Sequence, residues 1–366
     1  MSHRPTNLPK NCAMSPNAAP DNNSTDRSSR PNLVGLDTAR VLAMGMVVIQ
    51  HASSLSGRDD LTAVAGLSIG QVGVAIFLVV SGLLSQESRR EPISWLMQRF
   101  LRVYPAFWIA MIGSFCLASL SGYKAVSVGM IVSQMLGTGL WTHSGELVNS
   151  PTWFVSLILA CYLATFLSRL IHRAGLVAAI SAAALTWMVA RDPAPWLLSH
   201  ALTYAVASTI AAYAAGTTRR VVTVSAAAVL MMLAMLQQPA FAYTAIGLII
   251  VELSLLLPYR SRIIKLAAEY SYEFYLLHGV ALAGALGMMK HTPRLAVMAA
   301  LISTAVAAVV LNNFAGFILR KLLPTTAVTR TIQTTNANLG FRSRFHALPP
   351  RSAHLELSEK CVSTGR

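Results

Sequence analysis

An apolar stretch between residues 33 and 55 carries three side chains that can do chemistry, Asp37, Arg40 and His51. At about 1.5 Å per residue, the stretch is long enough to cross a bilayer as one helix. A charge held in hydrocarbon costs several kcal/mol, so such residues usually face a protein interior or a wet cavity. The stretch is therefore the first candidate for a functional site.

The spacing of these residues predicts a shared helical face. Arg40 and His51 are eleven residues apart, which returns an α-helix to within about 20° of its starting direction and separates the two side chains by about 16 Å along the axis. Asp37 lies three residues before Arg40, within reach of the guanidinium. One helix thus offers a fixed cation and, deeper, a titratable imidazole. The alternative is that Asp37 and Arg40 are interfacial anchors and His51 is a core histidine.

A second stretch contains paired arginines, Arg99 and Arg102, followed by Tyr104 and Pro105. Two guanidinium groups on one face of a helix repel each other unless an anion lies between them. A phosphate or pyrophosphate fits that role through charge-assisted, bidentate hydrogen bonds. An ordinary cluster of positive charges against lipid headgroups explains the same spacing, so both interpretations stay open here.

A third stretch places Ser271, Tyr275 and His278 on one helical face, because they are spaced at i, i+4 and i+7. The face offers two hydroxyl groups and a second imidazole to a substrate cavity, whereas Glu273 lies off it. A structural network of hydrogen bonds between helices is the alternative explanation.

The composition is that of a membrane protein with many spans. Of the 366 residues, 54% are hydrophobic and only 12% are charged, with a mean hydropathy of +0.55. Lys and Arg outnumber Asp and Glu by 29 to 14, but the basic residues sit in short connectors and in the two tails. There they would face anionic lipid headgroups, which argues against a nucleic-acid partner. The four cysteines have no metal-ligand spacing, and we predict no metal site.

The apolar segments predict an all-α, polytopic fold of about ten transmembrane helices. The basic connectors can all face the cytoplasm only if one segment, residues 126–141, is re-entrant or interfacial instead of spanning. Both termini are then cytoplasmic. The expected apolar segments are 33–55, 68–85, 95–120, 126–141, 153–170, 176–190, 196–214, 221–236, 241–257, 266–289 and 295–319.

The ends of the chain are polar and lack a pattern of secondary structure. We expect residues 1–32 to be a disordered cytoplasmic arm and residues 324–366 to be a disordered, basic cytoplasmic tail. Residues 33–323 then form the membrane domain. The tail is too short and too poor in apolar residues to be a second enzymatic domain.

The chain resembles the acyltransferase 3 family of integral membrane acyltransferases. The resemblance rests on five motifs that occur in the family's order, from about residue 32 to about residue 323. The first has the family's order of Leu, Asp, two residues, Arg, ten residues and His. The motifs are LDTARVLAMGMVVIQH, VGVAIFLVVSGLL, QRFLRVYPAFW, PTWFVSLILACYL and YSYEFYLLH.

The resemblance implies transfer of an acyl group, commonly acetyl, from cytoplasmic acyl-CoA to a hydroxyl of a polysaccharide, glycan or lipid-linked saccharide. The protein would be a multi-pass protein of the cell inner membrane. His51 would be the general base, and Asp37 would orient Arg40. The donor acetyl-CoA would be bound by Arg40, Arg99, Arg102 and Tyr104, and the substrate cavity would contain Ser271, Tyr275 and His278.

The sequence departs from the family pattern in one helix and leaves two other classes open. Ile158 and Leu159 stand where many members have a glutamate pair, so we assign no acid there. A secondary transporter for an anionic metabolite would use the same arginines as its substrate site and His51 as a proton relay, although we find no internal repeat. A membrane sensor or scaffold that keeps the fold without the chemistry is the third interpretation.

Overall fold

The computed structural model describes residues 31–322, apart from 65, 87–90, 123, 172–194, 237–238, 260 and 290. The described part consists of helices and their connections, with one hairpin in which β1 (Ala63–Val64) pairs antiparallel with β2 (Leu67–Ser68) after the short helix η2 (Asp59–Thr62). The residues outside the described part include 1–30, 323–366 and the whole of the expected segment 176–190 with its flanks.

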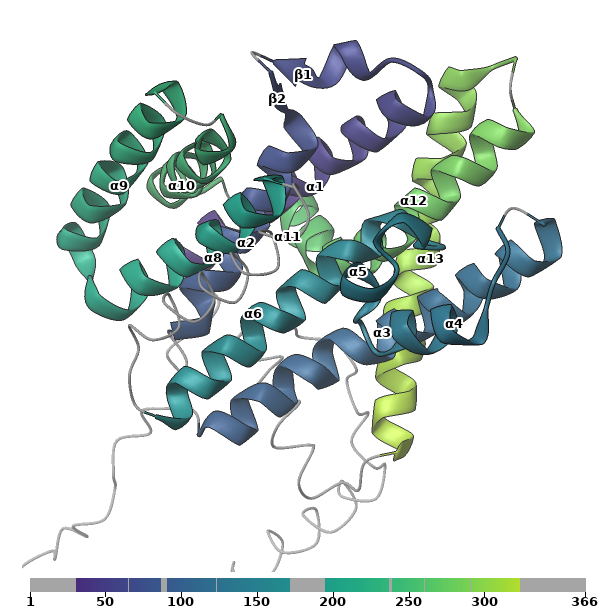
Figure 1. Cartoon of the computed structure of the whole chain (residues 1–366), viewed down its shortest axis with the longest axis horizontal. Helices are drawn as coiled ribbons and strands as arrows, with labels where there is room; N and C mark the ends of the chain where they lie inside the picture. The colour runs from purple at the N-terminus through teal and green to yellow at the C-terminus, as the bar shows by residue number, and fades with distance from the viewer. Residues whose placement is uncertain are drawn as a thin grey trace, which may run out of the picture.

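Nine long helices of the described part follow the apolar segments expected from the sequence (Figure 1). Their ends differ from the expected ends mostly by a few residues, because apolar length defines a membrane helix well. They are α1 (Pro31–Leu55), α2 (Ile69–Gln86), α3 (Pro92–Ser121), α6 (Trp153–Leu170), α8 (Pro195–Tyr213), α9 (Gly216–Leu236), α10 (Ala240–Leu256), α12 (Ser271–Met288) and α13 (Pro293–Leu322).

The segment 126–141 forms two short helices, α4 (Val128–Met135) and α5 (Gly139–Thr142). Gly137 interrupts them with a φ of 74°, which a residue with a side chain rarely adopts. Eight residues span only about 12 Å, far less than the roughly 30 Å of a hydrocarbon core. The segment therefore does not cross as one helix. The connection onward contains the short helices η3 (Ser144–Glu146) and η4 (Ser150–Thr152).

The expected single helix over 266–289 is wrong, because the chain forms two helices there. Helix α11 (Arg262–Glu269) ends at Tyr270, and α12 starts at Ser271, whose hydroxyl donates to the carbonyl of Ala268 at 2.8 Å. Ile263 is largely exposed, whereas Ala268 is buried. Helix α11 is thus a short amphipathic element against α1, and a continuous apolar count could not show the change of direction.

Helix α1 lies at the centre of the packing. It contacts α2, α10, α11 and α12, and α2 in turn packs against α8. In Figure 1, α9 and α10 lie on one side of α1 and α2, and α12 and α13 lie on the other. Buried side chains of α3, α6 and α12 form one core cluster, and those of α1, α2, α9 and α10 form a second. The residues of α1 are therefore held from several directions.

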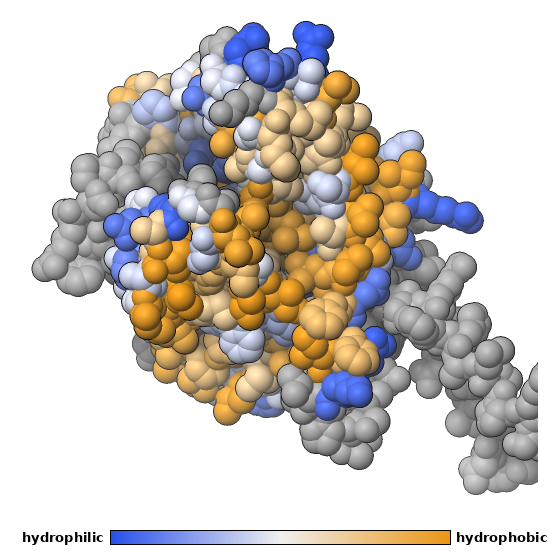
Figure 2. Space-filling view, turned by 90° about the vertical axis from the view of Figure 1, so that its right-hand side faces the viewer, coloured by the Kyte–Doolittle hydropathy of each residue, from blue (hydrophilic) through white to orange (hydrophobic). Residues whose placement is uncertain are grey.

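Five helices of the described residues are long and apolar enough to cross a membrane, namely α2, α3, α9, α13 and the stretch Ser150–Leu170 that includes α6. Helix α13 exposes an apolar stripe that includes Ile302, Val306 and Val310, with the spacing of one helical face. Figure 2 shows broad apolar surface on one face of the molecule, with hydrophilic side chains gathered towards its edges. The chain is an all-α, multi-pass membrane protein.

Gly73 sets the close contact between α2 and α1. A Cβ atom at this position would lie 2.6 Å from the carbonyl oxygen of Ala43, which is backbone and cannot swing away. Gly73→Ala should therefore lower the thermal unfolding midpoint of the purified protein, with a loss of about 1–3 kcal/mol from overpacking. Gly113→Ala is the matched control, because a Cβ there meets nothing within 4 Å. Equal midpoints for the two variants would contradict the close contact.

Candidate functional site

Four arginines gather at one end of the bundle, where α1, α3 and α12 begin and α2 and α6 end. They come from α1, α3 and the last turn of α6. Each guanidinium lies close enough to at least one other to be repelled by it. We call this group the basic cluster, and its members are Arg40, Arg99, Arg102 and Arg169.

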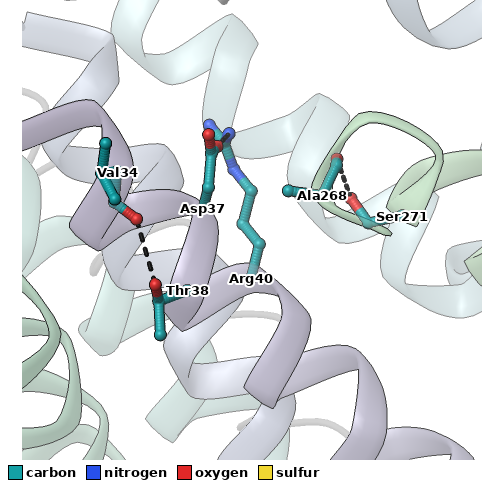
Figure 3. A network of polar contacts seen from close by, with 6 residues as sticks. All are labelled: Val34, Asp37, Thr38, Arg40, Ala268 and Ser271. Atoms are coloured by element: carbon teal, nitrogen blue, oxygen red, sulfur yellow. Dashed lines mark hydrogen bonds and ion pairs between the residues drawn. The ribbon is translucent and has the colours of Figure 1, made fainter. Parts of the chain in front are cut away.

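Arg40 is held by the carboxylate expected from the sequence. Its Nη1 donates to Oδ1 of Asp37 at 2.8 Å, and the two side chains are only 13% and 24% exposed. Figure 3 shows the Arg40 side chain extending along α1 towards Asp37, beside the junction where Ser271 bonds Ala268. The pair fixes the direction of the guanidinium, and Asp37 compensates part of the positive charge of the cluster.

Arg99 is positioned by two aromatic rings and one backbone group. Its guanidinium carbon lies 5.4 Å from the ring centroid of Trp95 and 5.3 Å from that of Tyr162. Its Nη2 also donates to the carbonyl of Leu84 at 3.3 Å. Cation–π contacts of this kind orient a guanidinium without neutralising it, so the charge remains available to an anion.

Arg169 belongs to the cluster although the sequence indicated only a basic connector. Its guanidinium carbon lies 4.7 Å from the ring centroid of Trp95, and its Nη2 donates to the carbonyl of Ser85. Trp95 therefore contacts two guanidinium groups that are seventy positions apart in the chain. The aromatic residue one turn before Arg99 was the available signal, but nothing local connects it to α6.

Arg102 lies near a carboxylate that the sequence did not assign to the site. Glu273 of α12 attracts Arg102, is 7% exposed, and accepts a hydrogen bond from Nδ2 of Asn312 at 3.0 Å. The neighbouring Tyr272 donates its hydroxyl to the carbonyl of Val103 at 3.0 Å. The Tyr272 contact joins α12 to α3 beside Arg102, and the Asn312 contact joins α12 to α13. Glu273 does lie off the face of His278, and it faces the arginines instead.

His51 and His278 form an imidazole pair deeper in the bundle. Their ring centroids are 5.1 Å apart and their planes are inclined by 58°. Nδ1 of His278 lies 2.6 Å from the carbonyl oxygen of Tyr275. Because a carbonyl only accepts, Nδ1 carries the proton and Nε2 of neutral His278 carries the lone pair. The fold thus brings together two histidines from stretches that the sequence singled out separately.

Three of the predicted site residues use their hydroxyl groups within the fold. Tyr275 donates to the carbonyl of Pro151, and Ser271 closes the turn between α11 and α12. Tyr104 donates to the carbonyl of Leu136 at 2.9 Å. Since Tyr104 is two residues after Arg102, its side chain points about 200° away around the helix, so it supports α4 and is not brought into the basic cluster.

Helix α1 contributes both a member of the basic cluster, Arg40, and a member of the imidazole pair, His51. The basic cluster can bind a polyanion by charge-assisted hydrogen bonds, and His51 lies about 16 Å further along α1. Within the described residues, no group of three or more His, Cys, Asp or Glu side chains is placed to hold a metal ion.

The fold and the site define a class, namely a multi-pass membrane protein with a cluster of arginines at one end of its bundle and an imidazole pair inside it. The chain belongs to the acyltransferase 3 family, since the family model described as an acyltransferase domain matches residues 33–313. No curated protein and no solved structure matched the chain. The matched region contains the whole basic cluster and both histidines, and the chain is a membrane acyltransferase.

Proposed function

We propose that the protein transfers an acetyl group from cytoplasmic acetyl-CoA to a hydroxyl of a cell-surface or lipid-linked glycan. The observation that carries this proposal is the position of Arg40 and His51 on one face of α1, with the other arginines gathered around Arg40. Coenzyme A is a polyanion that cannot enter hydrocarbon, so its phosphates suit the basic cluster at the end of the bundle. The thioester then extends along α1 towards His51.

In the proposed reaction, His51 acts as the general base. A hydroxyl is a poor nucleophile near neutral pH, so a neutral imidazole accepts its proton as the oxygen attacks the thioester carbonyl. A carbon–oxygen bond forms and the carbon–sulfur bond breaks. The CoA thiolate leaves and takes up the proton that His51 received. The products are an acetyl ester and free CoA, and the base returns to its neutral form.

The proposed topology places the basic cluster on the cytoplasmic side of the inner membrane. Ten segments span, namely the nine long helices and the apolar stretch 176–190, whereas α4 with α5 and α11 do not. Both termini are then cytoplasmic, and the basic connectors face the side that supplies acyl-CoA, as the distribution of Lys and Arg in membrane proteins favours.

The test uses the protein in proteoliposomes with acetyl-CoA that carries label in the acetyl group. The acceptor is a saccharide-containing extract of the source membranes. We expect label to enter the extract while free CoA appears in equal amount. A product one acetyl group heavier than an extract component would identify the acceptor. Label that enters no acceptor would contradict the proposal, and intact CoA inside the liposomes would favour the transporter.

A further inference from the structure

Asn149 is a buried amide that is only half satisfied. It precedes η4, is 1% exposed, and donates from Nδ2 to the carbonyl of Leu276 at 2.7 Å. Because that carbonyl only accepts, the amide nitrogen must face it, and Oδ1 is turned away. Oδ1 has no hydrogen-bond donor among the described residues. Asn149 therefore offers one buried acceptor atom.

His278 offers a second buried acceptor. The side chain is fully buried, and its Nδ1–H is used by the carbonyl of Tyr275. The lone pair on Nε2 has no donor within the described part of the chain. Oδ1 of Asn149 and Nε2 of His278 are thus both hydrogen-bond acceptors. In each side chain, a nitrogen atom donates to a backbone carbonyl of α12 and so fixes the orientation of the group.

The two acceptors lie at the same level of α12, one turn beyond Tyr275. Oδ1 of Asn149 is 3.3 Å from the position that a Cβ of Gly279 would occupy, and Gly279 follows His278 directly. Because Gly279 has no side chain, the segment at Pro151 can approach α12. The hydroxyl of Tyr275 donates a hydrogen bond to the carbonyl of Pro151. The ring of His51 lies 5.1 Å from that of His278, so the proposed base lies beside the second of these side chains.

The chemistry of these atoms distinguishes between the two substrates. A buried acceptor without a donor is unfavourable, so the ligand that binds here must supply donors. The thioester itself has no hydrogen-bond donor, the phosphates of CoA offer acceptor oxygens, and the amide N–H groups of its pantetheine arm are single donors spaced along a thin chain. A hydroxyl supplies one donor, and neighbouring hydroxyls on one sugar ring supply two.

We propose that Oδ1 of Asn149 and Nε2 of His278 form the subsite for the substrate that receives the acyl group. Each atom accepts a hydrogen bond from one of two neighbouring hydroxyl groups of a polyhydroxylated ring. This inference rests on the proposed function and names the class of its acceptor, a vicinal diol. These contacts hold the attacking hydroxyl near His51, and they do not involve acyl-CoA.

The test compares His278→Asn, His278→Gln and Asn149→Leu in the proteoliposome assay, with the amount of membrane extract varied. The shorter Asn amide keeps a donor near the carbonyl of Tyr275 and removes the atom at Nε2, whereas Gln restores an acceptor at that position. We expect His278→Asn and Asn149→Leu to raise the KM for the extract by about three- to tenfold, and His278→Gln to recover part of it. CoA affinity should not change.

Thr203→Val is the control for removing a buried polar atom, because its hydroxyl pairs with Thr244 at 2.6 Å away from the site. Periodate, which cleaves vicinal diols, should make the extract inactive as an acceptor. Wild-type protein that transfers nothing would defeat the proposed function itself. If the wild-type protein transfers acetyl groups but His278→Asn and Asn149→Leu leave the KM for the extract unchanged, only the subsite is overturned. Full activity of the periodate-treated extract would overturn it as well. CoA affinity that falls in parallel would show a structural role instead.

Discussion

His51→Gln is expected to bind CoA normally and to lose acyl transfer by a factor of roughly 10² to 10⁴, the usual contribution of a positioned base. The amide can hydrogen-bond beside His278 but cannot take a proton at any useful pH. The basic cluster is about 16 Å away along α1, so donor binding should be unaffected. The measurement is the rate of label transfer from acetyl-CoA, with CoA affinity determined on the same preparation.

The control for this variant is His200→Gln. His200 is fully buried, whereas His51 is half-buried; the ring of His200 stacks on Trp153 with 5.8 Å between ring centroids and bonds Gln71, and it is not a member of the imidazole pair. Transfer by this control should stay near the wild-type rate. Near-normal transfer by His51→Gln would remove His51 from the mechanism. If His51→Gln lost proton-coupled uptake but still exchanged intact substrate across the membrane, the result would instead support the transporter.

Arg102→Ala is expected to weaken CoA binding about 10- to 100-fold at low salt, since a charge-assisted contact contributes roughly 1.5–3 kcal/mol. Arg99→Ala should act in the same direction. Salt should reduce the difference, because mobile ions screen phosphate contacts. Arg102→Lys should recover only part of the affinity, because an ammonium cannot form the bidentate contact. Calorimetry of CoA binding to the purified variants at two salt concentrations measures these effects.

Arg294→Ala is the matched control, because Arg294 is an exposed arginine at the first turn of α13, a position outside the basic cluster. Its removal lowers the net charge by the same amount. If Arg294→Ala weakened CoA binding as much as Arg102→Ala, the effect would come from overall charge. If Arg99→Ala and Arg102→Ala both left the affinity for CoA unchanged, the two arginines would be contacts to lipid headgroups instead of a donor site.

The sequence predicted what depends on local periodicity. The ends of α1, α2 and α6 follow from apolar length, and the contact of Asp37 with Arg40 follows from their spacing of three residues. The break between α11 and α12 was missed because both sides of Tyr270 are apolar enough to continue a helix. Apolarity alone does not record a change of direction.

The parts of the site that were missed depend on contacts between distant helices. Arg169 joins the basic cluster through Trp95, and Glu273 joins it through its position beside Arg102. Asn149 becomes notable only when its amide nitrogen is seen to face α12. Each of these residues has an ordinary neighbourhood in the chain, so no pattern in a single sequence distinguishes it from a connector residue or a helix cap.

Because Arg40 and His51 lie on one continuous helix, α1 fixes the distance between them. The spacing between the anion site and the proposed base is set by eleven residues of hydrogen-bonded backbone, so rearrangement of neighbouring helices leaves it unchanged. An insertion of four residues between them would shift His51 by about 6 Å and keep nearly the same face. Under the proposed mechanism, the number of residues between Arg40 and His51 therefore sets how long a donor must be to reach the base, whatever the packing of the other helices.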